Sequence, residues 1–445
     1  MSKLINNAYW YIGVVLYVLF SFYNVTTGNF LLLHLASLVS FVLFGIIVVE
    51  ISKRRFAFFT KQNLFFIVLG CSLLEIMLYQ LLSYYIDGDT FVFSKVDAML
   101  YYTESIKMSK MGFGESFDYL SNHFGFDDWG AFLWIATVFR IIPSQIFLSI
   151  THGIVGSISA IMLFDIGRTV MPRRYAFFAA LTFSIASFTT ILYAACVKET
   201  IFVCLIIASF HAFYSFLRCK KVWYLIFTLG WISTILLFRI PVALILLFSF
   251  SLTLVLIYSK GLVVAILGII VSLIICSSSF FAMTFDRYLR GGDVELILER
   301  KNELAGDGGI VNQITDPLSA LIGPFPSVTM NVVKNTPLST SGLLYRLLLA
   351  FPFFVGVYYA FRYKYRSVYP LIFFFLANAL GVAISVKGLE MRLSFPHLPM
   401  MYLVAFWCLA KYDYRRMRIK LNRKCVYACV VAVVTICIVW NLRLI

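Results

Sequence analysis

The chain has 445 residues, of which 61% are hydrophobic and 13% charged, and its formal net charge is +16. A soluble domain carries about 25% charged residues, so this composition excludes a soluble protein and indicates a polytopic membrane protein. The lysines and arginines lie in short clusters between apolar runs, and we therefore expect no nucleic-acid partner. The nine cysteines include no CxxC pair, which predicts neither a disulfide framework nor a zinc site.

Apolar runs long enough to cross about 30 Å of hydrocarbon recur along the chain, and we expect about thirteen spans. The expected spans are residues 8–27, 30–52, 64–86, 145–167, 176–196, 200–217, 222–238, 242–258, 262–283, 344–361, 367–386, 394–411 and 425–443. No small-residue cleavage site follows the first run, so we expect an uncleaved span there. The predicted fold is an all-α polytopic membrane protein.

The distribution of basic residues predicts the topology. If Lys3 lies in the cytoplasm, every compact basic cluster falls on the cytoplasmic side, as the positive-inside rule requires. Two large loops, 87–130 and about 285–342, then lie outside. We expect N-terminal spans in 1–63, a transmembrane core in 64–283 that carries the first outer loop, a second outer loop in 284–343 and C-terminal spans in 344–445.

The first outer loop contains three candidate general bases. Asp87 and Asp89 follow the third expected span. Asp97 lies four residues before Tyr101, so we expect Asp97 and Tyr101 on one face of a helix. Carboxylates held just above hydrocarbon can have a raised pKa and accept a proton. The alternative is that these acids are solvated loop residues. Asp87 and Asp89 could also share a divalent cation with a diphosphate or with Asp97.

The rest of this loop predicts structure at the membrane surface. We expect an amphipathic stretch over about 105–120 that lies on the membrane and ends near His123 and residues 127–129. Residues 130–142 are apolar but too short to cross, and Arg140 and Pro143 interrupt them, so we expect a re-entrant or surface-lying helix.

Further charged residues lie at the ends of expected spans on the outer side. Lys198 and Glu199 occupy a tight turn, and Arg239 is surrounded by apolar residues, so an anionic partner is expected. The alternative for Lys198 is a surface cation paired locally with Glu199. The remaining members of this set are Arg140, Glu390, Arg392 and His397. Arg140, Arg239 and Arg392 could together clamp a lipid phosphate.

The order of these motifs resembles a known family. The sequence runs Asp97-Ala98-x-x-Tyr101, Arg140-x-x-Pro143-Ser144, Lys198-Glu199, Arg239-x-Pro241 and Arg392-Leu-Ser-Phe-Pro. It is similar to the bacterial GT-C-class membrane glycosyltransferases of the protein O-mannosyltransferase and aminoarabinose transferase superfamily. The resemblance covers about 87–258 well and 387–407 more weakly. Two additional N-terminal spans and the lack of a soluble C-terminal domain depart from the family pattern.

The resemblance implies a multi-pass enzyme of the bacterial inner membrane. It would transfer a sugar from a polyprenyl phosphate donor to a glycan, lipid or protein acceptor at the outer face. The catalytic acid would map to Asp97, or to Asp87 or Asp89. Arg239, Arg392, Lys198 and Arg140 would bind the donor phosphate, with Tyr101, Glu199, Glu390 and His397 in support.

Two other function classes remain open from the sequence. An O-antigen or capsular polysaccharide polymerase would act on polyprenyl diphosphate oligosaccharides, with Arg287, Arg290 and Arg300 of the second loop on the diphosphate. A lipid-linked oligosaccharide flippase or other transporter would instead place charges on broken helices near the middle of the membrane. No internal repeat of the kind found in many transporters is evident.

Overall fold

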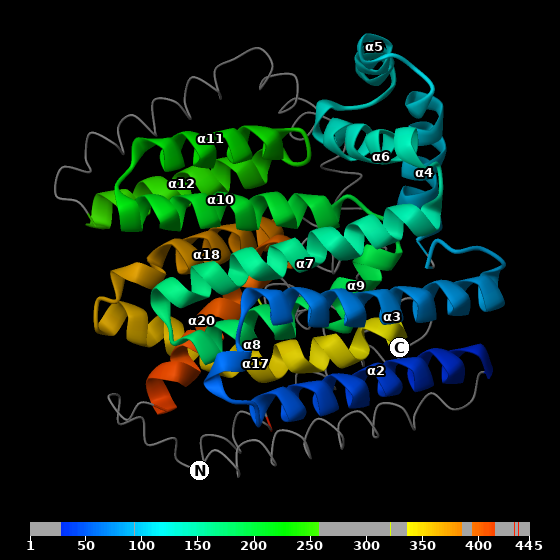
Figure 1. Cartoon of the computed structure of the whole chain (residues 1–445). Helices are drawn as coiled ribbons and strands as arrows, with labels where there is room; N and C mark the ends of the chain where they lie inside the picture. Colours follow the sequence, from blue (N-terminus) through cyan, green and yellow to red (C-terminus); the bar gives the residue numbers. More distant parts are fainter. Residues whose placement is uncertain are drawn as a thin grey trace.

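The computed structural model describes residues 28–92, 94–257, 336–384 and 394–413, together with the isolated positions 321, 431 and 435. Every regular element within these ranges is a helix. Figure 1 shows the long helices packed side by side in one bundle, with a group of shorter helices at one end. The prediction of an all-α fold is therefore confirmed for the described residues.

Among the described residues, six helical segments are long and apolar enough to cross a membrane, or seven if one bent pair of helices is a single span, and they indicate a multi-pass membrane protein. The bundle consists of α2 (Gly28–Ser52), α3 (Lys61–Asp87), α7 (Gln145–Val170), α8 (Arg173–Ser184), α9 (Ser187–Ala194), α10 (Glu199–Cys219), α11 (Val222–Leu236), α12 (Ile240–Ile257), α17 (Thr336–Arg362), α18 (Tyr369–Ile384) and α20 (Leu398–Asp413). The spans expected at 8–27, 262–283 and 425–443 lie outside the described ranges.

The structure corrects three of the expected spans. The span expected at 176–196 is broken into α8 and α9, which bend by 50° at a short interruption. The helix expected at 222–238 ends at Leu236 and has 15 residues, about 22 Å, too short to cross hydrocarbon unaided. The helix expected at 344 begins at Thr336, eight residues earlier.

Local sequence signals explain where several helices begin and end. The hydroxyl of Thr60 accepts a hydrogen bond from the amide of Asn63 and caps α3. At its other end α3 stops at Gly88, whose φ of 75° is readily adopted only by a residue without a Cβ atom. Pro396 interrupts the start of the twelfth expected span, which opens with the 3-10 helix η4 (Phe395–His397).

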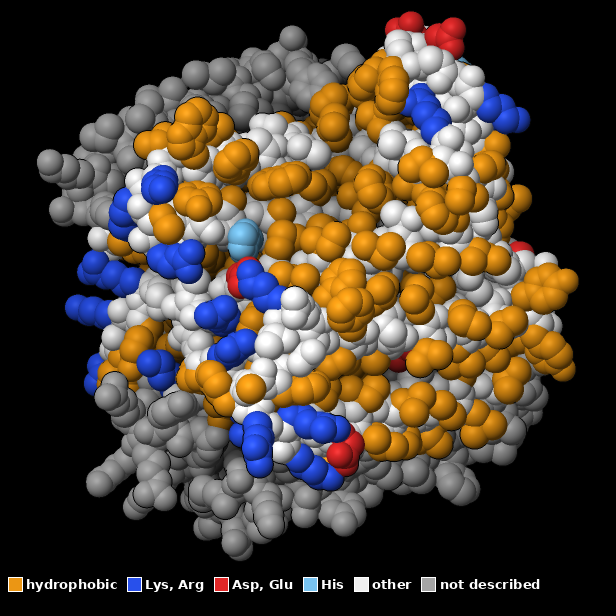
Figure 2. Space-filling view, in the orientation of Figure 1, with side chains coloured by type: hydrophobic (Ala, Val, Ile, Leu, Met, Phe, Trp, Pro, Cys, Tyr) orange, Lys and Arg blue, Asp and Glu red, His pale blue; other side chains and the backbone are white. Residues whose placement is uncertain are grey.

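One end of the bundle is strongly basic. Arg174 donates a hydrogen bond to the carbonyl of Ser52 at 2.7 Å, and Lys61 pairs with Asp165 at 2.5 Å, which ties the ends of α2, α3, α7 and α8 together. Tyr214 near the end of α10 donates to the carbonyl of Ser367 at 2.7 Å. Figure 2 shows lysine and arginine side chains gathered at this end, on the left of the view, beside a broad hydrophobic surface. This is the arrangement that the positive-inside rule predicts for a cytoplasmic end.

The shorter helices cover the opposite end. They are α4 (Lys95–Ser109), α5 (Phe113–His123), the 3-10 helix η2 (Phe126–Asp128) and α6 (Trp129–Ile141), at the upper right of Figure 1. They share a small hydrophobic core of their own, which includes Met108, Leu120 and Phe132. The stretch expected at 105–120 is divided between α4 and α5 by a turn at Lys110–Gly112, whereas α6 covers most of the helix expected at 130–142.

Candidate functional site at the end opposite the basic residues

The candidate site forms where α10 and α12 begin beneath the short helices. The amide of Gly130, at the start of α6, donates a hydrogen bond to the carbonyl of Leu237 in the turn between α11 and α12 at 2.8 Å. A Cβ atom on Gly130 would lie 2.4 Å from the ring of Phe238. Only glycine therefore permits this close approach, which positions α6 against the residue before Arg239.

Two ion pairs lie at this junction, one between the short helices and the bundle and one within the bundle. Lys198, immediately before α10, pairs with the carboxylate of Asp128 in η2. Arg239, immediately before α12, lies 3.4 Å from the carboxylate of Glu199, which is only 2% exposed. The alternative in which Lys198 pairs with its neighbour Glu199 is thus wrong, because each residue has its partner on a different element.

Tyr101 lies at the centre of this group of charges. Its hydroxyl donates a hydrogen bond to Asp128 at 3.3 Å, and its ring packs against Phe132. Burial raises the pKa of Tyr101 well above its usual value, and the carboxylates of Asp128, Glu199 and Asp97 raise this pKa further, whereas Arg239 lowers it. Tyr101 therefore remains a protonated hydrogen-bond donor at neutral pH.

We refer to Tyr101, Asp128, Lys198, Glu199 and Arg239 as the charge cluster. The negative charge of Asp97 acts on the hydroxyl of Tyr101, as expected from the four-residue spacing of the two residues on α4. Asp97 is half-buried in the first turn of that helix. An electrostatic interaction with Tyr101 thus connects this candidate base with the charge cluster.

The other two candidate bases lie at the end of α3. Asp87 is the last residue of the helix, before Gly88. The carboxylate of Asp89 accepts hydrogen bonds from the amide of Phe91 at 3.0 Å and from the hydroxyl of Ser83 at 3.4 Å. Asp89 thus stabilises the turn after α3, which is an ordinary structural role for an aspartate in a loop.

Arg140 and His397 have contacts outside the charge cluster. Arg140 donates to the carbonyl of Met111 at 3.0 Å and lies 3.8 Å from the ring centroid of Phe113, so it attaches α5 to α6. His397 is buried and shares a hydrogen bond of 2.8 Å with Asn378 inside the bundle. Arg392 and Glu390 lie outside the described residues, as do Arg287, Arg290 and Arg300. The expected clamp of three arginines includes Arg392 and therefore lies partly outside the described residues.

No described group of three or more histidine, cysteine, aspartate or glutamate side chains is arranged to hold a metal ion. The expected sharing of a divalent cation by Asp87, Asp89 and Asp97 thus has no support from the described residues. The charge cluster instead contains cations from the chain itself. Each of these cations is paired with a carboxylate of the same cluster.

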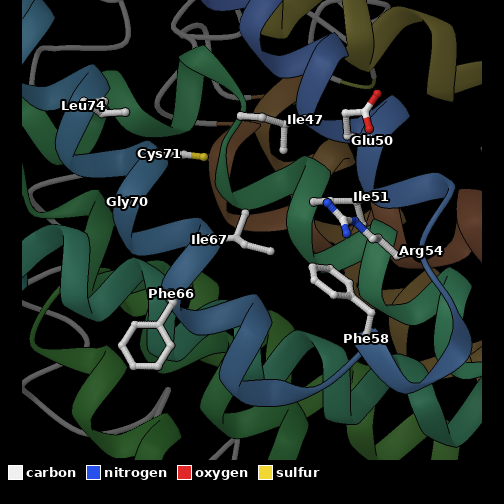
Figure 3. A pocket seen from close by; sticks show the side chains of 10 residues that line it. All are labelled: Ile47, Glu50, Ile51, Arg54, Phe58, Phe66, Ile67, Gly70, Cys71 and Leu74. Atoms are coloured by element: carbon white, nitrogen blue, oxygen red, sulfur yellow. The ribbon is translucent and has the colours of Figure 1, made fainter.

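An open apolar groove lies at the other end of the molecule, between α2 and α3 (Figure 3). It has a volume of about 360 Å³, and its walls are mostly aliphatic and aromatic side chains such as Ile47, Ile67 and Phe66. Glu50 and Arg54 lie at its edge near the basic end of the bundle. This lining suits contact with lipid chains and offers few groups for chemistry.

Sequence reasoning missed three charged residues that the structure makes prominent. Asp128 lies in a run of loop acids and gave no signal of its pairing with Lys198. Glu75 and Arg346 each lie within an apolar helix, and a charge in such a position is by itself a reason to suspect function. No protein-family model and no curated protein sequence matches the chain.

Proposed function

We propose that the protein is a membrane glycosyltransferase that moves a sugar from a polyprenyl phosphate donor to a glycan, lipid or protein acceptor at the outer face of a bacterial inner membrane. The observation that supports this proposal is the charge cluster, where carboxylates and cations meet at the end of the bundle opposite the basic residues. Transfer from a phosphate donor needs both kinds of group, a base for the acceptor and a cation for the leaving phosphate.

In the proposed reaction, the carboxylate of Asp97 accepts the proton of an acceptor hydroxyl. The acceptor oxygen forms a bond to the anomeric carbon, the bond between that carbon and the phosphate oxygen breaks, and polyprenyl phosphate leaves with both electrons of that bond. Arg239 and Lys198 would stabilise the charge that develops on the leaving phosphate. Glu199 and Asp128 would hold the two cations in place before the donor binds.

The test is transfer by the purified full chain, reconstituted in lipid with polyprenyl phosphate sugars. We expect the wild type to release polyprenyl phosphate, and we expect Asp97→Asn to bind the donor with at least 100-fold slower turnover, about the contribution of a general base. Asp118→Asn, an exposed acid on α5, is the matched control and should keep wild-type turnover. If the wild type does not consume a monophosphate donor but extends diphosphate-linked oligosaccharides, the protein is a polymerase instead.

A transporter of lipid-linked substrates is a second candidate, because one specific feature favours it. The break between α8 and α9 lies inside the bundle, and Glu75 of α3 accepts a hydrogen bond from Thr190 of α9. Broken helices with ionisable neighbours are typical of substrate sites in transporters. Movement of a fluorescent polyprenyl phosphate across sealed vesicles, without sugar transfer, would favour this candidate over the enzyme.

A further inference from the structure

Arg346 is a buried cation inside the helical bundle. It lies in an apolar part of α17, ten residues after the first residue of the helix and therefore about 15 Å along its axis. The side chain is 0% exposed, and none of its three guanidinium nitrogens has a hydrogen-bond partner within the described part of the chain. An arginine in this state is unusual, because buried charges are otherwise paired or bound to ligands.

The part of α17 that carries Arg346 packs beside the break between α8 and α9. One helical turn before Arg346, the amide of Gly342 donates a hydrogen bond to the hydroxyl of Ser187 at 2.9 Å. A Cβ atom on Gly342 would lie 2.7 Å from the ring of Phe188. The ring of Phe188 also packs against Tyr402 of α20, at 6.5 Å between centroids. Tyr402 is close enough to interact electrostatically with Arg346.

Further polar atoms near this break lack partners. The hydroxyls of Ser184 at the end of α8, Thr189 in α9 and Tyr402 are all buried without a hydrogen-bond partner in the described structure. Each hydroxyl can donate one hydrogen bond and accept others. Unpartnered buried polar groups are rare in folded proteins, so the pair of Arg346 and Tyr402, which interact with each other, indicates a place for a polar ligand.

The described acid in this part of the bundle does not neutralise Arg346. Glu75 accepts a hydrogen bond from Thr190, and its other polar neighbour is Tyr79, so it interacts on the side of α9 that contacts α3. Arginine does not lose its proton in proteins, so its charge has to be balanced by an anion. Its planar fork of donors matches a phosphate group in particular.

We propose that Arg346, with the hydroxyl of Tyr402, binds a phosphate group inside the bundle beside the α8–α9 break. The phosphate is the headgroup of a polyprenyl lipid or free phosphate. The lipid source rests on the proposed function, whereas phosphate binding itself does not. This second site is distinct from the charge cluster, whose arginine is paired with Glu199.

The experiment measures the thermal unfolding midpoint of the purified full chain in detergent, with farnesyl phosphate, farnesol or inorganic phosphate added. We expect farnesyl phosphate, but not farnesol, to raise the midpoint of the wild type by several degrees, because a ligand that binds only the folded state stabilises it. Arg346→Met should lose this shift. It should also have a higher midpoint than the wild type without ligand, because the substitution removes an unbalanced buried charge.

Arg362→Met is the matched control, since Arg362 is an exposed arginine at the end of the same helix. It should keep both the midpoint and the shift of the wild type. A shift with inorganic phosphate as well would identify free phosphate as sufficient, and a shift with farnesyl phosphate alone would identify the lipid headgroup.

The proposal is overturned if Arg346→Met retains the farnesyl phosphate shift, or if it unfolds at a lower temperature than the wild type without ligand. Should that variant not fold, Arg346→Lys keeps the charge but loses the fork, and it should weaken farnesyl phosphate binding at least tenfold. Unchanged binding by Arg346→Lys would also overturn the proposal. Because the readout is binding without turnover, a wild type that binds farnesyl phosphate but transfers no sugar would contradict only the proposed function.

Discussion

The guanidinium of Arg239 lies 3.4 Å from the buried carboxylate of Glu199, and this contact joins the first residue of α10 to the residue before α12. The same guanidinium lies over the ring of Phe202, one turn into α10, at 5.7 Å from its centroid. The start of α12 is thus held against the start of α10 by both charge and ring contact. Lys198, next to Glu199, then connects α10 to the short helices through Asp128.

Removal of Arg239 should destabilise the protein strongly. Arg239→Met leaves the carboxylate of Glu199 buried without its cation, which typically costs about 3 kcal/mol or more. The free energy of unfolding in detergent measures this cost. The double variant Arg239→Met/Glu199→Gln should be less destabilised than the sum of the two single variants, because it leaves no buried charge unpaired.

An exposed ion pair of the same chain serves as the control. Lys53 pairs with Glu50 at 2.6 Å, but both side chains are more than half exposed, so Lys53→Met should lower the free energy of unfolding far less than Arg239→Met does. Equal costs for Arg239→Met and Lys53→Met would contradict the structural importance of the buried pair.

Asp128 should be needed for activity although it was not among the expected site residues. Asp128→Asn removes the charge that pairs with Lys198 and weakens the acceptor for the hydroxyl of Tyr101. We expect at least a tenfold loss of sugar transfer by the reconstituted protein, about 1.4 kcal/mol in the barrier. Wild-type transfer by Asp128→Asn would remove this residue from the mechanism.

The close approach at Gly130 should not tolerate even one additional methyl group. Gly130→Ala would place its Cβ atom 2.4 Å from the ring of Phe238, so α6 or the turn before Arg239 must move. We expect a destabilisation of about 1–3 kcal/mol in thermal unfolding, as for other overpacked sites.

Gly230→Ala is the control, because a Cβ atom there meets nothing within 4 Å. It should stabilise α11 by up to about 1 kcal/mol through helix propensity. If Phe238→Leu restores the stability of Gly130→Ala, the clash is identified as the cause.

The contact between α4 and α5 should weaken in acid. Burial would raise the pKa of Glu104, but hydrogen bonds from Lys107 and Tyr119 outweigh burial and hold this pKa below its ordinary value of 4.5. A carboxylate with a lowered pKa in the folded state adds stability above its unfolded pKa, and this stability is lost as the pH falls through the folded pKa.

Hydrogen-exchange protection of α5 measures this effect, since Tyr119 of α5 donates to Glu104 of α4 at 2.6 Å. We expect protection factors in α5 to decrease as the pH falls below about 4, near the ordinary range of a glutamate pKa. The variant Glu104→Gln should show lower protection at neutral pH and no such decrease. A pH-independent protection of α5 in the wild type would argue against the role of this carboxylate.

Labelling with a membrane-impermeant thiol reagent tests which end of the bundle faces outward. Cys219, at the end of α10, is exposed at the basic end, and Asp118 is exposed on α5 at the other end. In a background without other cysteines, we expect Asp118→Cys to react in intact cells and Cys219 to react only after the membrane is permeabilised. The reverse result would invert the topology and place the charge cluster in the cytoplasm.

The sequence by itself determined the class of the fold and most of its helices. Hydrophobic runs of sufficient length must satisfy their backbone hydrogen bonds internally, so the runs that became α3, α7 and α10 could be located within a few residues. Charge distribution also determined that basic connections gather at one end, since Lys61, Arg173 and Arg174 all lie there.

Only the tertiary structure decided which charges meet. A salt bridge depends on side chains that are distant in the chain, so no local pattern distinguishes the pairing of Lys198 with Asp128 from pairing with Glu199. The break between α8 and α9 within the span expected at 176–196 was also seen only in the structure, where Gly342 of α17 packs closely against Phe188. The burial of Arg346 beside that break follows from the same packing, because the exposure of a side chain is set by neighbouring helices and not by its own sequence.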